Sequence, residues 1–265
     1  MYHLPATDLH LETRGSGDPA LFFHGSGGDL TSWTRQFPLA DAYELLLVDR
    51  RGYGESPARS FAYNLAQESA DLAALLTAPI HLVGHSYGGL LALLVAATMP
   101  QLIRTLTVSE PPAFAVARDH PDVEWLIERL APLITEEARL TPDAFAAQFD
   151  AAIGLAHDPT PPASGRRLKN RDAARMEQAA WRADIALDTL AAAPFPTLVI
   201  SGGWDDATTA PLHRSGRAYA AVCEVLEQRL GATRVVIRGA GHVIPRTGPP
   251  YNDCLRVFLA SATRG

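Results

Sequence analysis

The sequence predicts an α/β fold: a mostly parallel, doubly wound sheet with helices on both faces and a helical insertion. Short apolar, β-branched runs alternate with helix-like segments along the chain, which is typical of parallel sheets covered on both faces. Loops rich in glycine or functional side chains follow the carboxyl ends of the expected strands, where open α/β sheets bind ligands. One long stretch, residues 113–190, has several helix-like segments and no convincing strand, so it is the expected insertion.

The composition is that of a globular chain. Of the 265 residues, 47% are apolar and 20% are charged, which suits one large domain with an inserted subdomain. With a net charge of −6, the chain lacks the excess of basic residues that is typical of nucleic-acid-binding proteins. No stretch reads as a membrane span, and the N-terminus lacks the features of a signal peptide. Cys223 and Cys254 are expected to be free thiols of a cytoplasmic protein.

Apolar runs predict the strands in chain order, and helical spacing predicts the helices between them. Residues 3–13 alternate weakly, which fits an opening hairpin or an edge strand. The expected helices carry their apolar residues on one side, which would pack against the sheet. The expected strands are residues 20–23, 44–48, 80–83, 102–108, 196–200 and 234–237, and the expected helices are residues 66–76, 90–97, 218–230 and 253–259.

The most informative stretch is Gly84-His85-Ser86-Tyr87-Gly88. It lies between a short apolar run and a long one, so the expected context is a strand, a sharp turn and a helix. A Cβ at either glycine would collide with the neighbouring strand or helix. The Ser86 hydroxyl would then stand at the top of the sheet over the positive end of a helix, so Ser86 is the expected nucleophile.

Four motifs, in the expected order along the chain, resemble those of the α/β-hydrolases that carry a helical cap. The resemblance covers essentially the whole chain. It implies a core domain of residues 1–112 and 191–265 and a cap subdomain of residues 113–190. It also implies a serine, an acid and a histidine in that chain order. Dehalogenases and epoxide hydrolases are disfavoured because they carry aspartate in place of Ser86. The motifs are residues 24–27 (His-Gly-Ser-Gly), 49–56 (Asp-Arg-Arg-Gly-Tyr-Gly-Glu-Ser), 84–89 (Gly-His-Ser-Tyr-Gly-Gly) and 239–242 (Gly-Ala-Gly-His).

A serine needs a base, and His242 is the best candidate among the nine histidines. It follows the last expected strand in a glycine-rich loop late in the chain, in the order that this fold uses. His85 is next to the serine, but neighbours in an extended turn point apart, so His85 is expected to pack. His24 is expected to order the loop that follows its strand.

The acid has two candidate positions in the sequence. Most relatives supply it after the penultimate strand, where this chain has Asp205, three residues after Gly202, and Asp206. The other position is Glu110, which lies 24 residues past Ser86. It is at the end of the strand that comes after the helix following Ser86. There the sequence resembles zearalenone-type lactone hydrolases, in which a glutamate is the triad acid. We favour Glu110, with Asp205 as the alternative and a purely bracing role for Glu110 still open. The acid would fix the imidazole tautomer and stabilise the imidazolium.

Two backbone N–H groups are expected to form the oxyanion hole. One belongs to Tyr87, directly after the nucleophile, and the other to the turn at residues 24–26, with Ser26 preferred and Gly25 next. For substrate binding, Trp125, Trp181 and Phe114 of the insertion are the expected contacts, and core packing is the alternative for each. An apolar underside of the cap would fit an uncharged, fairly hydrophobic substrate.

These residues predict a serine hydrolase that cleaves a carboxylic ester or lactone through an acyl-enzyme. The same triad could instead hydrolyse a C–C bond or carry out perhydrolysis. A ligand receptor on the same fold is the non-catalytic alternative. No metal or organic cofactor is expected, because the sequence has no ligand-spaced cluster. The expected partner is a small-molecule substrate, with no nucleic acid and no membrane, and a homodimer is left open.

Overall fold

The computed structural model describes residues 2–135, 140–153, 155, 164–205 and 210–262. Seven strands form one sheet in the order β1-β3-β2-β4-β5-β6-β7, and only β1 runs antiparallel to its neighbour. This confirms the mostly parallel sheet. The strands are β1 (Leu11–Arg14), β2 (Asp18–Phe23), β3 (Tyr43–Val48), β4 (Ile80–His85), β5 (Ile103–Ser109), β6 (Thr197–Gly202) and β7 (Thr233–Ile237).

Helices cover both faces of the sheet because successive strand residues point to opposite sides. Leu21 and Phe23 of β2 belong to one buried cluster, together with apolar residues of α1 (Leu65–Ala73), α2 (Tyr87–Thr98) and α7 (Ala210–Leu230). Ala20 and Phe22 belong to the opposite cluster, together with residues of the 3-10 helix η1 (Leu30–Asp41) and of α8 (Pro249–Ser261). The sheet is therefore wound on both sides, as the alternating runs predicted.

The elements differ from the predicted ones mostly at their ends. Helix α2 begins at Tyr87, directly after Ser86, and not at residue 90. The expected edge strand over residues 3–13 is confined to β1 at its end. The 3-10 helix η1, which contains Pro38 and is capped by the Asp29 carboxylate, was not predicted. The short turns η2 (Pro100–Leu102) and η6 (Ile244–Thr247) complete the connections.

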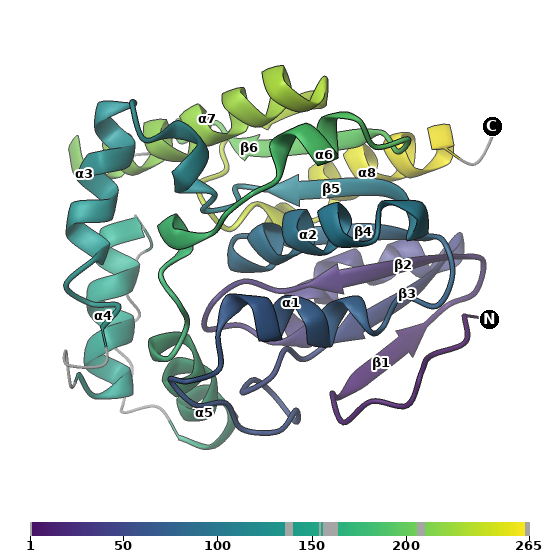
Figure 1. Ribbon diagram of the computed structural model, residues 1–265, viewed down its shortest axis with the longest axis horizontal. Coiled ribbons are helices and arrows are strands. Elements are labelled where there is room, and N and C mark those ends of the chain that lie inside the picture. The colour runs from purple at the N-terminus through teal and green to yellow at the C-terminus, as the bar shows by residue number, and fades with distance from the viewer. Residues whose placement is uncertain (1, 136–139, 154, 156–163, 206–209, 263–265) are drawn as a thin grey trace.

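Between β5 and β6, the described residues form helices and short 3-10 turns. We call residues 113–190 the helical segment. Figure 1 shows α3, α4 and α5 standing at the end of the sheet toward which the parallel strands point. The segment therefore lies beside the strand ends that carry the predicted motifs. Its elements are η3 (Phe114–Ala117), α3 (Pro121–Leu130), α4 (Pro142–Ile153), α5 (Gly165–Arg175), η5 (Ala180–Arg182) and α6 (Leu187–Ala191), the last of which ends one residue beyond it.

The register of β4 and β5 places two predicted site residues side by side. His85, the last residue of β4, pairs with Ser109, the last residue of β5. Ser86 and Glu110 each follow one of these paired residues, so both leave the sheet at the same level. The Ser86 N–H also donates to Ser109 O over 2.9 Å, which extends the pairing into the turn.

Candidate active site

Ser86 occupies a sharp turn between β4 and α2, with φ 52° and ψ −128°. An L-residue adopts this backbone only where the surroundings impose it, at a cost of roughly 1–3 kcal/mol. The surroundings here are close: a Cβ on Gly84 would lie 2.4 Å from Gly88 O, and one on Gly88 would lie 2.2 Å from Phe23 O. Glycine at these two positions lets the strand and the helix approach each other, and the serine at the apex is held in one orientation.

The Ser86 hydroxyl meets the imidazole of His242, although 156 residues separate them in the chain. Ser86 Oγ lies 2.9 Å from His242 Nε2, and both residues are buried, at 8% and 3% exposure. The aromatic ring of Tyr219 packs against the imidazole with a centroid distance of 4.4 Å. His85 Nε2 donates to His242 O over 2.8 Å, which anchors the backbone of the histidine loop. His242 is therefore held at the face of its ring by Tyr219 and at its backbone carbonyl by His85.

Glu110 lies on the other side of the same imidazole. His242 Nδ1 is 2.8 Å from Glu110 Oε2. The second oxygen, Oε1, accepts hydrogen bonds from Gly202 N over 2.9 Å and from Trp204 Nε1 over 2.8 Å. The carboxylate is fully buried, so these three contacts replace its hydration. They also fix the imidazole so that Nδ1 carries a proton and Nε2 can accept the one from Ser86.

The other two candidate acids lie apart from this chain of hydrogen bonds. Asp205 is exposed, and its Oδ2 accepts a hydrogen bond from Gly239 N over 2.9 Å. It braces the turn that precedes His242. Asp206 lies outside the described residues.

Neither Trp204 nor Tyr219 was predicted as a site residue. Trp204 has a positive φ of 53°, a feature shared among the described non-glycine residues only by Ser86 and Glu110. Its indole stacks on the phenol of Tyr219 at a centroid distance of 6.3 Å with an interplanar angle of 10°. The two aromatic residues thus enclose the acid and the imidazole. The only available signal in the sequence was that Trp204 directly precedes a candidate acid.

The turn at residues 24–26, which we call the oxyanion turn, lies against the nucleophile. A Cβ on Gly25 would be 2.9 Å from Ser86 Cβ, so only glycine fits there. Tyr87 begins α2, and the N–H groups of a first helical turn have no partner within the helix. Gly25 and Tyr87, two of the three residues predicted to form the oxyanion hole, therefore lie next to Ser86. The Ser26 hydroxyl donates to the carboxylate of Glu177, which belongs to the helical segment.

Two buried histidines near this turn are neutral. His24 donates from Nδ1 to Gly25 O over 2.8 Å and accepts at Nε2 from Arg50 N over 3.1 Å, so it orders the turn as expected. Burial first, and then the charge of Arg50, lower the pKa of His24 to about 3. Burial, and then its neighbour His242, lower the pKa of His85 to about 3. Neither adds a charge beside the candidate site at neutral pH.

The three predicted substrate contacts lie in different surroundings. Phe114 is buried and packs on Tyr219 at a centroid distance of 5.5 Å, which places it next to the aromatic ring that covers His242. Trp125 is half-buried and lies beside the guanidinium of Arg214, 4.4 Å from the ring centroid. Trp181 is half-buried and packs against the larger core cluster. Phe114 alone of the three is linked to the site by a described ring contact.

Two cavities are lined in part by the helical segment. The larger, of about 550 Å³, is lined by Gly27, Gly28, Arg35, Arg166 and Arg246, among others. The smaller, of about 330 Å³, is lined by residues 175–179 together with Phe61, Ile134, Thr135 and Arg182. Neither lining includes Ser86 or His242.

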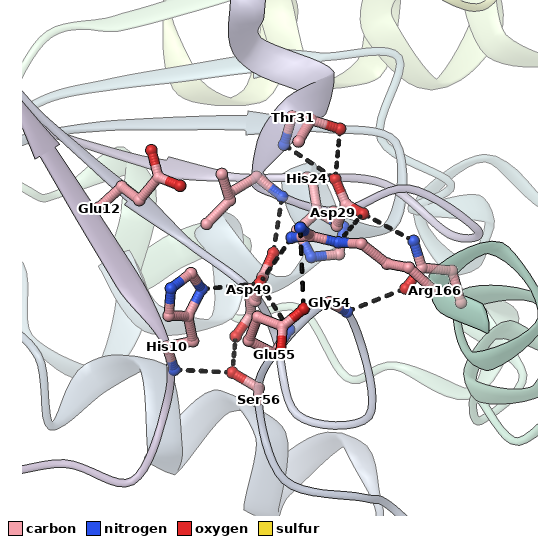
Figure 2. A network of polar contacts seen from close by, with 12 residues as sticks. His10, Glu12, His24, Asp29, Thr31, Asp49, Gly54, Glu55, Ser56 and Arg166 are labelled. Atoms are coloured by element: carbon pink, nitrogen blue, oxygen red, sulfur yellow. Dashed lines mark hydrogen bonds and ion pairs between the residues drawn. The ribbon is translucent and has the colours of Figure 1, made fainter.

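Helix α5 contacts the loop at residues 49–56, which is one of the four motifs. Figure 2 shows Arg166 of α5 reaching between two carboxylates of the core. Its Nε donates to Asp29 Oδ2 over 2.8 Å, and its second guanidinium nitrogen donates to Asp49 Oδ2 over 3.1 Å. Lys169 Nζ donates to Gly54 O and to Ser56 O, each over 2.7 Å. The helical segment is thus attached to the core through polar contacts.

A doubly wound sheet with a serine in the turn after a central strand, hydrogen-bonded to a histidine and through it to a carboxylate, is typical of the α/β-hydrolase class. A family model described as "Alpha/beta hydrolase family" matches residues 20–249. The chain therefore belongs to the alpha/beta hydrolase family. The helices of the described residues include none with the length and hydrophobicity of a membrane span.

Known proteins similar to this chain include esterases and a lactone-degrading enzyme. A pimeloyl-[acyl-carrier protein] methyl ester esterase from Aeromonas hydrophila is 37% identical over 120 residues, which is 44% of this chain and 45% of that protein. This chain thus matches less than half the length of that relative. A carboxylesterase structure from Nitrososphaera gargenis has 19% identity and a TM-score of 0.67, covering 97% of this chain and 95% of that one. Est816, described as an N-acyl homoserine lactone degrading enzyme, has 22% identity and a TM-score of 0.62, covering 97% and 100%. At these identities the two structures establish the fold alone.

Proposed function

We propose that the protein is a serine hydrolase that cleaves a carboxylic ester or lactone of a fairly hydrophobic small molecule. The observation that carries this proposal is the unbroken chain of hydrogen bonds from Ser86 Oγ through both ring nitrogens of His242 to Glu110. A base within hydrogen-bond reach of a hydroxyl, oriented in turn by a third group, is what nucleophilic catalysis by serine requires.

In the first half of the reaction, Ser86 Oγ attacks the carbonyl carbon while its proton passes to His242 Nε2. The carbonyl oxygen becomes an oxyanion that accepts hydrogen bonds from Tyr87 N–H and from the N–H of Ser26 or Gly25. The imidazolium that forms is stabilised by the Glu110 carboxylate at Nδ1. When the tetrahedral intermediate collapses, the C–O bond to the alcohol breaks and His242 gives its proton to the leaving oxygen, which leaves an acyl-Ser86.

In the second half, water replaces the alcohol. His242 takes a proton from water as the water oxygen attacks the acyl carbon, and the same N–H groups hold the second oxyanion. Collapse breaks the bond to Ser86 Oγ, the serine regains its proton from His242, and the acid is released. A lactone would follow the same path, with the alcohol and the acid as two ends of one product.

The helical segment would act as a cap that supplies the substrate pocket, with Phe114, Trp125 and Trp181 as its substrate contacts. Its place at the carboxyl ends of the strands supports this, because open α/β sheets bind their ligands there. The named activities of similar proteins, a methyl ester esterase and an N-acyl homoserine lactone degrading enzyme, support an ester or lactone as the scissile group.

The test is covalent labelling by a fluorophosphonate probe, followed by a substrate screen. Wild-type protein should be labelled, and Ser86→Ala should not. p-Nitrophenyl esters of increasing acyl length, acyl homoserine lactones and macrocyclic lactones would then define the substrate. Absence of both labelling and turnover in the folded wild-type protein would favour a ligand receptor. Turnover of a diketone, with no ester or lactone hydrolysed, would favour C–C bond hydrolysis.

A further inference from the structure

Glu177 is a buried carboxylate of the helical segment that the proposed reaction does not use. It follows α5 and is 6% exposed. One oxygen, Oε2, accepts the hydroxyl of Ser26 in the oxyanion turn. The other, Oε1, accepts from an Arg50 guanidinium N–H over 2.7 Å and from the Tyr53 hydroxyl over 2.5 Å. Glu177, a carboxylate of the helical segment, thus contacts the turn at residues 24–26 that faces the nucleophile.

Arg50 balances the charge of this carboxylate and reaches the same turn itself. It is fully buried, and its Nε donates to His24 O over 2.9 Å. Its remaining guanidinium nitrogen donates to Glu68 over 2.5 Å, and Glu68 also accepts from Arg59 over 3.1 Å. Two cations therefore meet two anions in the buried cluster. Arg50 and Tyr53 engage only Oε1 of Glu177, so charge balance does not explain why the other oxygen, Oε2, accepts from Ser26.

We propose that Glu177 is a positioning residue that fixes the oxyanion turn through the Ser26 hydroxyl, so that the helical segment completes the oxyanion hole. This inference rests on the proposed function. The carboxylate limits the rotation of the Ser26 side chain, and through Arg50 and His24 it also holds the preceding peptide. The N–H of Ser26 is thereby kept directed at the place where the oxyanion forms.

The expected effect is kinetic, because an oxyanion donor acts in the transition state and not on the bound substrate. We expect Glu177→Gln to lower kcat by about 10- to 100-fold with little change in KM, as a displaced donor does. The affinity of a trifluoromethyl ketone should fall by a similar factor, since its hemiketal oxygen occupies the oxyanion hole. The fluorophosphonate should still label Ser86, at a reduced rate.

A double-variant cycle separates this role from general support. Ser26→Ala removes the hydroxyl and keeps the backbone N–H, so it should lower kcat by the same mechanism. If Glu177 acts through that hydroxyl, the double variant should lose no more than the stronger single variant, because Ser26→Ala removes the same contact that Glu177→Gln weakens by removing its charge. Independent, multiplicative losses would overturn the proposal.

Lys169→Met is the matched control for docking of the helical segment. It removes two contacts between α5 and the core at Gly54 O and Ser56 O without touching the oxyanion turn. It should lower the thermal midpoint while kcat stays within about twofold of wild type. A loss of kcat as large as that of Glu177→Gln would mean that Glu177 serves only to dock the segment, which would overturn the proposal.

The remaining outcomes are also decisive. If Glu177→Gln does not fold, Ser26→Ala carries the test alone, and an unchanged kcat and ketone affinity would overturn the proposal. A folded Glu177→Gln with wild-type kcat would do the same. Failure of the proposed function looks different, because the wild-type protein itself would then show neither fluorophosphonate labelling nor turnover.

Discussion

Trp204 Nε1 donates a hydrogen bond to Glu110 Oε1 over 2.8 Å, and this indole is the only side chain among the described residues that bonds to that oxygen. The other oxygen of the carboxylate is engaged by His242. The acid is thus directed from both sides, by an indole at one oxygen and an imidazole at the other. Both residues come from loops that follow the last two strands, whereas Glu110 follows β5.

Trp204→Phe should weaken both catalysis and stability. The buried carboxylate would lose one of its three contacts, which costs about 1.5–3 kcal/mol for a hydrogen bond to a charged group. If the same free energy is lost in the transition state, kcat falls roughly 10- to 100-fold. Trp33→Phe is the matched control, because Trp33 is also buried and its indole N–H has no hydrogen-bond partner among the described atoms. Equal kcat values for the two variants would contradict the role of the indole.

Glu110→Gln should abolish most activity, and Asp205→Asn should not. An amide in place of the triad acid stabilises the wrong imidazole tautomer, and such a change lowers kcat by about 10⁴-fold. Among the described residues, the hydrogen bond of the Asp205 carboxylate is to the backbone N–H of Gly239, so its loss should alter kcat by no more than about tenfold. Steady-state kinetics on a p-nitrophenyl ester would measure both. The reverse order of effects would move the acid to the loop after β6.

Ser86→Gly should give a more stable protein than Ser86→Ala. Both variants lose the hydroxyl, but only glycine adopts φ 52° with ψ −128° without strain. The expected difference in the free energy of unfolding is about 1–3 kcal/mol in favour of glycine. Urea denaturation of the two inactive variants measures it. A glycine variant less stable than the alanine variant would show that the elbow is unstrained.

Gly25→Ala should impair the reaction because of the distance to the nucleophile. The added Cβ would lie 2.9 Å from Ser86 Cβ, so either the turn or the serine must move. A displacement near 1 Å costs about 100-fold in rate. Gly241→Ala is the control within the histidine loop, since its Cβ would come no closer than 3.8 Å to another residue. If both variants keep the wild-type kcat, the turn does not contact the reacting groups.

Low pH should destabilise the fold through buried neutral histidines. The pKa of His85 is about 3 in the folded protein and about 6.5 when unfolded, so the unfolded chain binds a proton that the folded chain does not. Its contribution is fully present above pH 6.5 and is lost as the pH falls toward 3, by about 1.4 kcal/mol per pH unit. His85→Gln keeps a donor for His242 O and should flatten this dependence. Urea unfolding between pH 7 and 4.5 would measure the difference in slope, and identical slopes would contradict it.

Most of the fold and the elbow could be predicted from the sequence because their signals are local. An apolar run, two close-approach glycines and a helix-forming run lie within a few residues of Ser86. The acid could not be settled in this way, since Glu110 and Asp205 both follow strands. In the structure they differ by long-range contacts: Glu110 binds His242, 132 residues away, whereas Asp205 accepts a hydrogen bond from the backbone of Gly239.

The attachment of the helical segment was not predicted for the same physical reason. Glu177 pairs with Arg50 over 127 residues and with Ser26 over 151 residues, and no local pattern marks any of the three as a partner. The 3-10 helix η1 was missed because Pro38 interrupts its pattern, and its N-terminus is instead fixed by the Asp29 carboxylate and by Asp49, which accepts from Leu30 N over 2.8 Å.

Ser86 and Glu110 both follow the paired ends of β4 and β5, so one rigid part of the sheet positions them. His242, in contrast, lies on a separate loop near the end of the chain. Warming should therefore uncouple His242 from its two partners before the sheet itself loosens. Enzymatic function would disappear below the melting temperature, with far-ultraviolet circular dichroism still that of the intact protein. To raise the temperature at which the protein remains active, substitutions should stabilise the histidine loop. Tighter packing of the sheet core would raise that temperature little.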